Sequence, residues 1–138
     1  MSTRSYIGYC DNGFKNIKFV YCHWDGYVEF NGVLLNEHYN DIDKIKELIR
    51  SGDFSSLKEN VSDITYYNES LTPVHFAENL EELAKSLPGI DFVYLYDVSN
   101  GTWYVSNTSY IYDTQKEDFI PLTSEIARIE EENRKNEE

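Results

Sequence analysis

The strongest constraint on the fold is a strand–turn–strand pattern in the second half of the chain. The segment Phe92–Tyr96 is a run of aromatic and branched side chains, which is typical of a buried strand. Asn100-Gly101 follows, and this pair favours a tight hairpin turn because both residues accept a positive φ at little cost. Trp103–Val105 would return as the partner strand. This pattern predicts a hairpin within a larger sheet.

A second hairpin is predicted near the N-terminus. Ser5–Cys10 is rich in aromatic and branched residues, Asp11-Asn12-Gly13 is a turn signal, and Ile17–Trp24 reads as the returning strand. After a further turn at Asp25-Gly26, the segment Tyr27–Phe30 is predicted as a short third strand.

Apolar residues at helical spacing predict three to four helices that pack against the sheet. The expected helices are Val33–Tyr39, a helix capped by Asn40 or Asp41 with the stripe Ile42, Ile45, Leu48 and Ile49, a helix with the stripe Leu80, Leu83, Ala84 and Leu87, and a last helix with Leu122, Ile126 and Ile129. Two further strands are expected at Asp63–Tyr67 and Tyr110–Tyr112, and Phe54 and Leu57 are expected in the core.

These elements predict one α+β domain over residues 1–129. Its antiparallel sheet, made of two hairpins plus extra strands, would carry its helices on one face. Residues 130–138 have no apolar side chain to bury, so we expect a frayed, acidic helical tail. The length of 138 residues is typical of a single domain, and 41% apolar residues exclude a disordered chain.

Composition also limits the kind of partner. Twelve basic and 25 acidic residues give a net charge of −13, which argues against direct binding of nucleic acid or of an anionic membrane. No apolar run approaches the ~20 residues that span a bilayer. The segment Met1–Tyr6 lacks the apolar stretch of a signal peptide, so we expect no signal peptide.

The acidic residues are concentrated in the second half of the chain. Residues 1–60 carry 7 basic and 9 acidic side chains, whereas residues 61–138 carry 5 basic and 16 acidic ones. The excess can serve solubility alone, or it can present a negative surface to a basic partner, because carboxylates replace phosphates at Lys and Arg side chains. The candidate partner-binding acids are Glu78, Glu81, Glu82, Asp91, Asp97 and Asp113.

The residues typical of catalysis or metal binding form only weak patterns. Cys10, Cys22, His23 and His38 allow a zinc interpretation, but the Cys-x-x-Cys spacing is missing and buried free thiols are favoured. A Cys22 nucleophile would need His38 or His75 as its base, with no third group evident. We therefore predict no metal, no cofactor and no enzymatic activity.

Aromatic residues are densest in the segment Tyr21–Tyr27. The favoured interpretation is a core strand that ends in a turn, with Trp24 plugging the sheet. The alternative is an aromatic pocket, and its candidate residues are His23, Trp24, Asp25 and Tyr27.

The same segment resembles a family of small proteins from tailed phages and prophages. The resemblance includes Met1–Ser5, Gly32, Leu34-Leu35, His38-Tyr39 and Gly52–Leu57, and more loosely Glu78–Leu83, Val93–Tyr96 and Trp103–Val105. This chain has Val28 where the family often has Pro after Gly-Tyr.

The resemblance implies a phage accessory protein that acts in the cytoplasm of an infected bacterium. Together with the acidity it favours an inhibitor of a host defence nuclease, similar in kind to anti-CRISPR proteins. Such an inhibitor would occupy a basic nucleic-acid-binding surface of a host protein, for example an RNA-guided nuclease. The alternative is a small pocket protein, either a nucleotide-signal sponge or a minor enzyme. A third possibility is a protein that binds another host factor.

Overall fold

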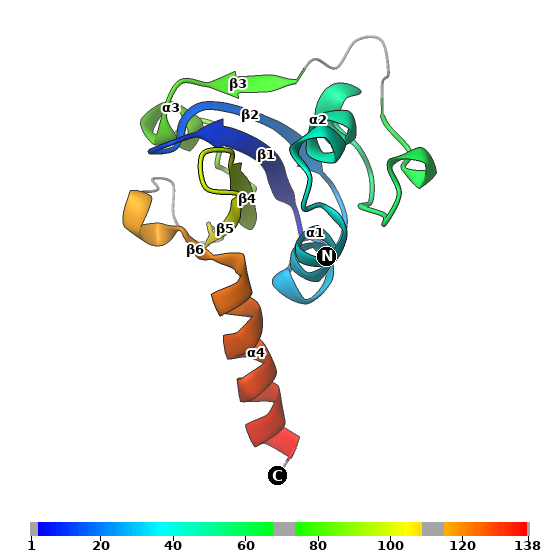
Figure 1. Ribbon diagram of the computed structural model, residues 1–138, viewed down its shortest axis with the longest axis vertical. Helices are drawn as coiled ribbons and strands as arrows, with labels where there is room; N and C mark the ends of the chain where they lie inside the picture. Colours follow the sequence, from blue (N-terminus) through cyan, green and yellow to red (C-terminus); the bar gives the residue numbers. More distant parts are fainter. Residues whose placement is uncertain (1–2, 68–73, 109–114, 138) are drawn as a thin grey trace.

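The computed structural model describes residues 3–67, 74–108 and 115–137, and it has an α+β fold (Figure 1). A six-stranded sheet has the order β3-β2-β1-β4-β5-β6. The strands are β1 (Ser5–Asp11), β2 (Lys15–Cys22), β3 (His75–Ala77), β4 (Phe92–Asp97), β5 (Thr102–Asn107) and β6 (Ile120–Pro121). The α-helices are α1 (Val33–His38), α2 (Ile42–Arg50), α3 (Leu80–Ala84) and α4 (Leu122–Glu137). The predicted fold class is confirmed.

Both predicted hairpins are present, and a parallel pair joins them. β1 pairs with β2 in antiparallel fashion, with Ser5 opposite Cys22, and β4 pairs with β5 in the same way, with Phe92 opposite Asn107. β1 and β4 run parallel, with Ser5 opposite Phe92. The sheet is therefore mostly antiparallel, with one parallel pair at its centre.

The helices cover both faces of the sheet, so the expectation of helices on one face was wrong. α1, α2 and α4 bury apolar residues in one core cluster, whereas Leu83 of α3 and Leu87 belong to the cluster on the other face. The reason lies in β4, where Tyr94 faces the first cluster and its neighbours Val93 and Leu95 face the second. A strand that is apolar on both faces must be covered on both.

Two predicted strands are not strands. The segment predicted as Tyr27–Phe30 forms the π-helical turn η1 (Val28–Gly32), which buries Val28 while Phe30 remains exposed. Asp63–Tyr67 contains the end of the 3-10 turn η2 (Val61–Asp63) and a single bridge to Phe54. In both places packing against the core outweighs the local preference for a strand.

Other differences concern short segments. The strands β3 and β6 were not predicted, and they have only three and two residues. The predicted strand Tyr110–Tyr112 lies outside the described residues. A short 3-10 turn, η3 (Lys116–Asp118), precedes β6. Within the part of the chain that the structure describes, no helix is both long and apolar enough to cross a membrane.

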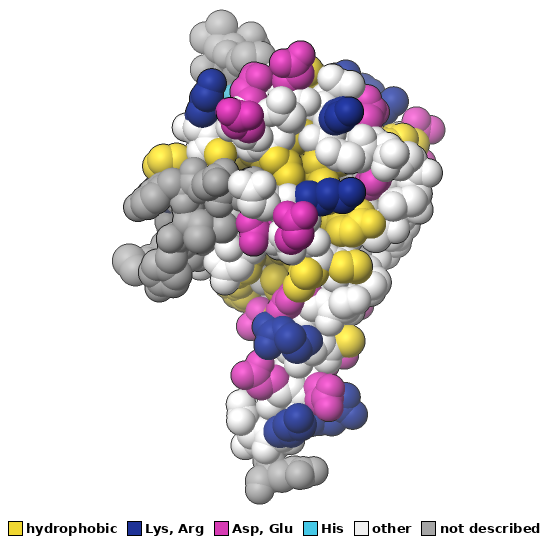
Figure 2. All heavy atoms as spheres, turned by 90° about the vertical axis from the view of Figure 1, so that its left-hand side faces the viewer, with side chains coloured by type: hydrophobic (Ala, Val, Ile, Leu, Met, Phe, Trp, Pro, Cys, Tyr) yellow, Lys and Arg dark blue, Asp and Glu magenta, His cyan; other side chains and the backbone are white. Residues whose placement is uncertain are grey.

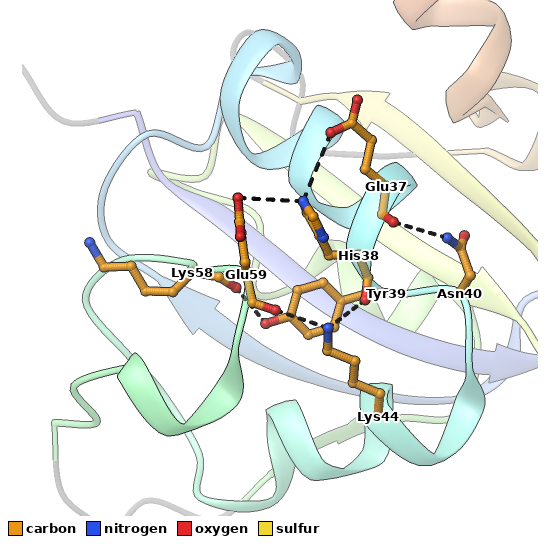
Figure 3. Close-up of polar contacts among 7 residues, drawn as sticks. All are labelled: Glu37, His38, Tyr39, Asn40, Lys44, Lys58 and Glu59. Atoms are coloured by element: carbon orange, nitrogen blue, oxygen red, sulfur yellow. Dashed lines mark hydrogen bonds and ion pairs between the residues drawn. The ribbon is translucent and has the colours of Figure 1, made fainter.

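A polar network joins α1 to α2 and to residues 58–59 (Figure 3). The Lys44 ammonium donates to the carbonyl oxygens of His38 (2.6 Å) and Glu59 (2.9 Å), and it lies 4.4 Å from the centre of the Tyr39 ring. The His38 imidazole lies between the carboxylates of Glu37 and Glu59, at 3.9 and 3.6 Å. Because Lys44 binds backbone carbonyls, we interpret the network as structural.

The last helix extends from the body as an arm (Figure 1). Leu122 is fully buried, and Ile126 and Ile129 pack against the core with part of their surface exposed. The described residues after Ile129 are exposed up to position 136. The tail predicted over residues 130–138 is thus helical as far as Glu137, and its fraying stays a prediction.

Candidate functional site

The aromatic segment after β2 is held in place by backbone hydrogen bonds. The amide groups of His23 and Trp24 donate to the carbonyl oxygens of Phe54 (3.2 Å) and Ser55 (2.9 Å). The Cys22 thiol donates to the carbonyl oxygen of Trp24 at 3.5 Å. These contacts extend the pairing of β2 onto a buried segment, so the backbone of this loop has a structural role.

Trp24 does not plug the sheet, which corrects the favoured interpretation of this segment. Its side chain is 46% exposed and meets the edge of the His23 ring, with 4.5 Å between the ring centres. β2 ends at Cys22, and Asp25 turns the backbone with a φ of 57°. Gly26 then packs so closely that an added Cβ would lie 2.8 Å from the carbonyl oxygen of Thr3. The loop therefore turns Trp24 outward.

The four candidate pocket residues have different neighbours among the described residues. His23 Nδ1 lies 2.6 Å from the Tyr21 hydroxyl, and its ring contacts Trp24. Tyr27 is 38% exposed and pairs instead with Phe30, with 6.2 Å between the ring centres. None of His23, Trp24, Asp25 and Tyr27 lines the cavities described below.

The acids predicted to bind a partner have different environments. Glu78 precedes α3 and Glu81 lies on it, and both are exposed, whereas Glu82 of α3 is half-buried. Asp91 accepts a hydrogen bond from the Arg4 amide (3.0 Å). Asp97 is only 6% exposed, and its carboxylate accepts hydrogen bonds from the amide (2.9 Å) and the hydroxyl (2.6 Å) of Ser99. Asp97 therefore stabilises the turn between β4 and β5 and is not part of an exposed binding surface. Asp113 lies outside the described residues.

The two cysteines are buried in different core clusters, so the structure does not bring them together. Burial raises the pKa of the Cys22 thiol to about 11 and that of Cys10 to about 12. Both thiols are therefore protonated at neutral pH, which argues against the Cys–His nucleophile. Among the described residues no three metal-ligating side chains form a group.

A cleft with a volume of about 630 Å³ lies between α4 and the body, and we call it the α4 cleft. Its walls come from η1, from the adjacent β4 and β5, from the segment before α4, and from α4 itself. The lining residues are Val28, Glu29, Phe92, Val105, Ser106, Asn107, Asp118, Ile120, Glu125, Arg128, Ile129, Glu132, Asn133 and Asn136.

The charges in the α4 cleft are mostly negative. Glu29, Asp118, Glu125 and Glu132 contribute four carboxylates, and Arg128 is the cation in this lining. Figure 2 shows one face of the molecule, on which the arm carries both acidic and basic side chains.

Arg128 is already paired within α4. Its Nε donates to Glu125 at 2.8 Å and its Nη1 to Glu132 at 3.0 Å, and Glu125 also accepts from Nη2. These contacts raise the pKa of Arg128, with Glu125 as the main cause. The remaining acids, Glu29 and Asp118, are exposed.

Apolar surface lies beside these charges. Val28 and Val105 are buried, whereas Ile129 is half-buried and Ile120 is 38% exposed. A cleft with an apolar floor and an acidic rim fits a segment that carries both Lys or Arg and apolar side chains.

Sequence reasoning missed this site because its walls are far apart in the chain. Glu29 is brought opposite Glu132 only by the packing of η1 and α4. The spacing of Glu125, Arg128 and Glu132 on one helix face was the only local signal, and such spacing is common on solvated helices. We compared the chain with models of known protein families, with curated proteins and with solved structures, and none of them matches it.

Proposed function

We propose that this protein is a non-enzymatic binding protein that receives a basic segment of another protein in the α4 cleft. The observation that carries the proposal is the combination of a 630 Å³ cleft with four carboxylates in its lining. A net charge of −13 adds a long-range field that would attract a basic partner and speed its encounter.

The partner class that we propose is a basic nucleic-acid-binding surface of a host defence nuclease. Such surfaces present Lys and Arg side chains to phosphates, and carboxylates bind the same side chains through charge-assisted hydrogen bonds. The resemblance of the segment Tyr21–Tyr27 to phage proteins supports this context, in which the protein acts in an infected bacterium. By occupying the surface, the protein would keep nucleic acid from the nuclease.

Two matched double variants separate the α4 cleft from the acids beside α3. Glu29→Lys with Glu132→Lys reverses two cleft charges, whereas Glu78→Lys with Glu81→Lys reverses two exposed charges beside α3. Both variants change the net charge of −13 by the same amount, so any general effect of charge is shared. We expect both to fold, since surface substitutions usually cost within about 0.5 kcal/mol.

The assay is cleavage protection with purified RNA-guided nucleases at low and at moderate salt. We expect the wild type and the α3 variant to protect the nucleic acid substrate, and the cleft variant to protect it much less. Protection should weaken as salt rises, because the attraction is screened. If only the α3 variant loses protection, the binding surface is the one predicted from sequence. If no nuclease is inhibited, the proposed partner class is wrong.

A further inference from the structure

A second cavity has a volume of about 340 Å³. We call it the Arg4 pocket. It is lined by Arg4, Tyr6, Tyr21, Asp53, His75, Pro88, Gly89 and Ile90. None of these residues lines the α4 cleft.

The side chains of Asp53 and His75 form a dyad in this pocket. Asp53 Oδ1 accepts the Tyr21 amide at 2.8 Å and lies 3.1 Å from His75 Nε2. The Asp53 side chain is 19% exposed and that of His75 is 42% exposed. When Nε2 carries the proton toward Asp53, the other nitrogen of a neutral His75 is an acceptor. That nitrogen makes no hydrogen bond within the described residues.

Arg4 supplies the positive charge of the pocket. Its backbone is fixed by Asp91, whose carboxylate accepts the Arg4 amide and whose own amide donates to the Arg4 carbonyl oxygen (2.9 Å). Its guanidinium has no ion-pair partner among residues 3–67, 74–108 and 115–137. Burial raises the pKa of Tyr21, and the positive charge of Arg4 opposes this rise. The Arg4 guanidinium therefore interacts electrostatically with the Tyr21 phenol.

Two aromatic rings complete the lining. Tyr6 and Tyr21 meet edge to face, with 6.5 Å between their centres, and both are half-buried. The Tyr6 hydroxyl donates to the Ser86 carbonyl oxygen (2.6 Å), which fixes its ring. Aromatic faces of this kind bind planar rings.

From this arrangement we propose that the Arg4 pocket binds a nucleoside monophosphate. The Arg4 guanidinium would bind the phosphate, the acceptor nitrogen of His75 would bind a hydroxyl or amino group, and the tyrosine rings would contact the base. Asp53 is the positioning residue for His75, because its carboxylate already binds that ring. The candidate nucleotide site of this chain is therefore this pocket and not the cluster around Trp24.

The experiment is calorimetric titration of the purified protein with the four ribonucleoside 5′-monophosphates. Free nucleosides and inorganic phosphate are titrated separately, so that the contributions of ring and phosphate are distinguished. Arg4→Gln removes the charge from the pocket, and Arg50→Gln on α2 is the matched control because it removes the same charge outside the pocket. Thermal unfolding of each variant shows that it is folded.

We expect at least one monophosphate to bind. Arg4→Gln should lower the affinity for that monophosphate by about tenfold or more, whereas Arg50→Gln should leave the affinity unchanged. His75→Ala should also lower the affinity for the same monophosphate. Equal effects of Arg4→Gln and Arg50→Gln, or no binding of any monophosphate, would overturn the proposal. Because none of these probes is a protein and none of these variants lies in the α4 cleft, the result is independent of the proposed function.

Discussion

Two tryptophans in this chain have opposite environments, and their substitutions should differ accordingly. Trp24 is 46% exposed, whereas Trp103 is 4% exposed and donates from Nε1 to the Tyr39 carbonyl oxygen at 2.8 Å. We expect Trp103→Ala to lower the free energy of unfolding by about 3–5 kcal/mol, and Trp24→Ala to lower it by less than about 1 kcal/mol. Urea denaturation of both variants measures the difference. Equal losses would mean that Trp24 belongs to the core.

The buried thiols make stability depend on pH in the alkaline range. Burial raises the pKa of Cys22 from 9.0 to about 11, so the folded protein holds a proton that the unfolded chain has released. The stability associated with this proton is complete below about pH 9 and is lost as the pH rises through 11. We expect the free energy of unfolding to fall over this range, and to fall less steeply in Cys22→Ala.

Urea titrations at several pH values compare the slopes of the two proteins. The comparison concerns the slope alone, because Cys22→Ala also removes the thiol contact to the Trp24 carbonyl and lowers stability at every pH. If the free energy of unfolding fell equally steeply with pH in the wild type and the variant, Cys22 would not be a source of the pH dependence.

At the scale of elements, the start of α2 is set by a side chain. Asp41 precedes the helix, and its carboxylate accepts a hydrogen bond from the Asp43 amide at 3.0 Å. We expect Asp41→Ala to lower the free energy of unfolding by about 1 kcal/mol and Asp41→Asn to cost much less, because Asn caps a helix equally well. Thermal unfolding of the two variants tests this. If Asp41→Asn lowered the free energy of unfolding as much as Asp41→Ala, the effect would come from the negative charge of Asp41 and not from its hydrogen bond to the Asp43 amide.

The exposed end of α4 should be dispensable for folding but required for partner binding in the α4 cleft. The side chains of Glu132, Asn133 and Asn136 line one wall, while the ion pairs of this region are exposed. We expect deletion of residues 130–138 to change the free energy of unfolding by only about 0.5 kcal/mol. Binding of a basic partner should weaken and become less sensitive to salt. A large loss of stability in circular dichroism melts would contradict this division.

Sequence patterns predicted the elements that local physics determines. The Asn100-Gly101 turn and the stripe of α2 are such cases, since turn chemistry and helical spacing depend on neighbouring residues. The segment Tyr27–Phe30 was mispredicted because Val28 is buried against a helix that lies about one hundred residues later in the chain. Such long-range packing leaves no local pattern.

At the scale of the whole molecule, the same reasoning explains which parts of the site were missed. The composition shows that the protein is acidic, but a count of charges cannot distinguish an exposed carboxylate from one that is hydrogen-bonded within a turn. Asp97 was chosen for its charge and is buried, whereas Glu29 was not chosen and lines the α4 cleft. A cleft between segments that are distant in the chain becomes visible only once the fold is known.

The most direct test of the central claim is an NMR titration of the isotope-labelled protein with a short peptide rich in Arg, Lys and Leu. We expect amide shifts that are reduced by added salt and concentrated at residues lining the α4 cleft, namely Glu29, Val105–Asn107, Ile129, Glu132, Asn133 and Asn136. The Glu29→Lys, Glu132→Lys protein should lose these shifts. Shifts centred on α3, shifts spread evenly over the acidic surface, or shifts that survive the cleft variant would contradict the proposal that the α4 cleft is the binding site.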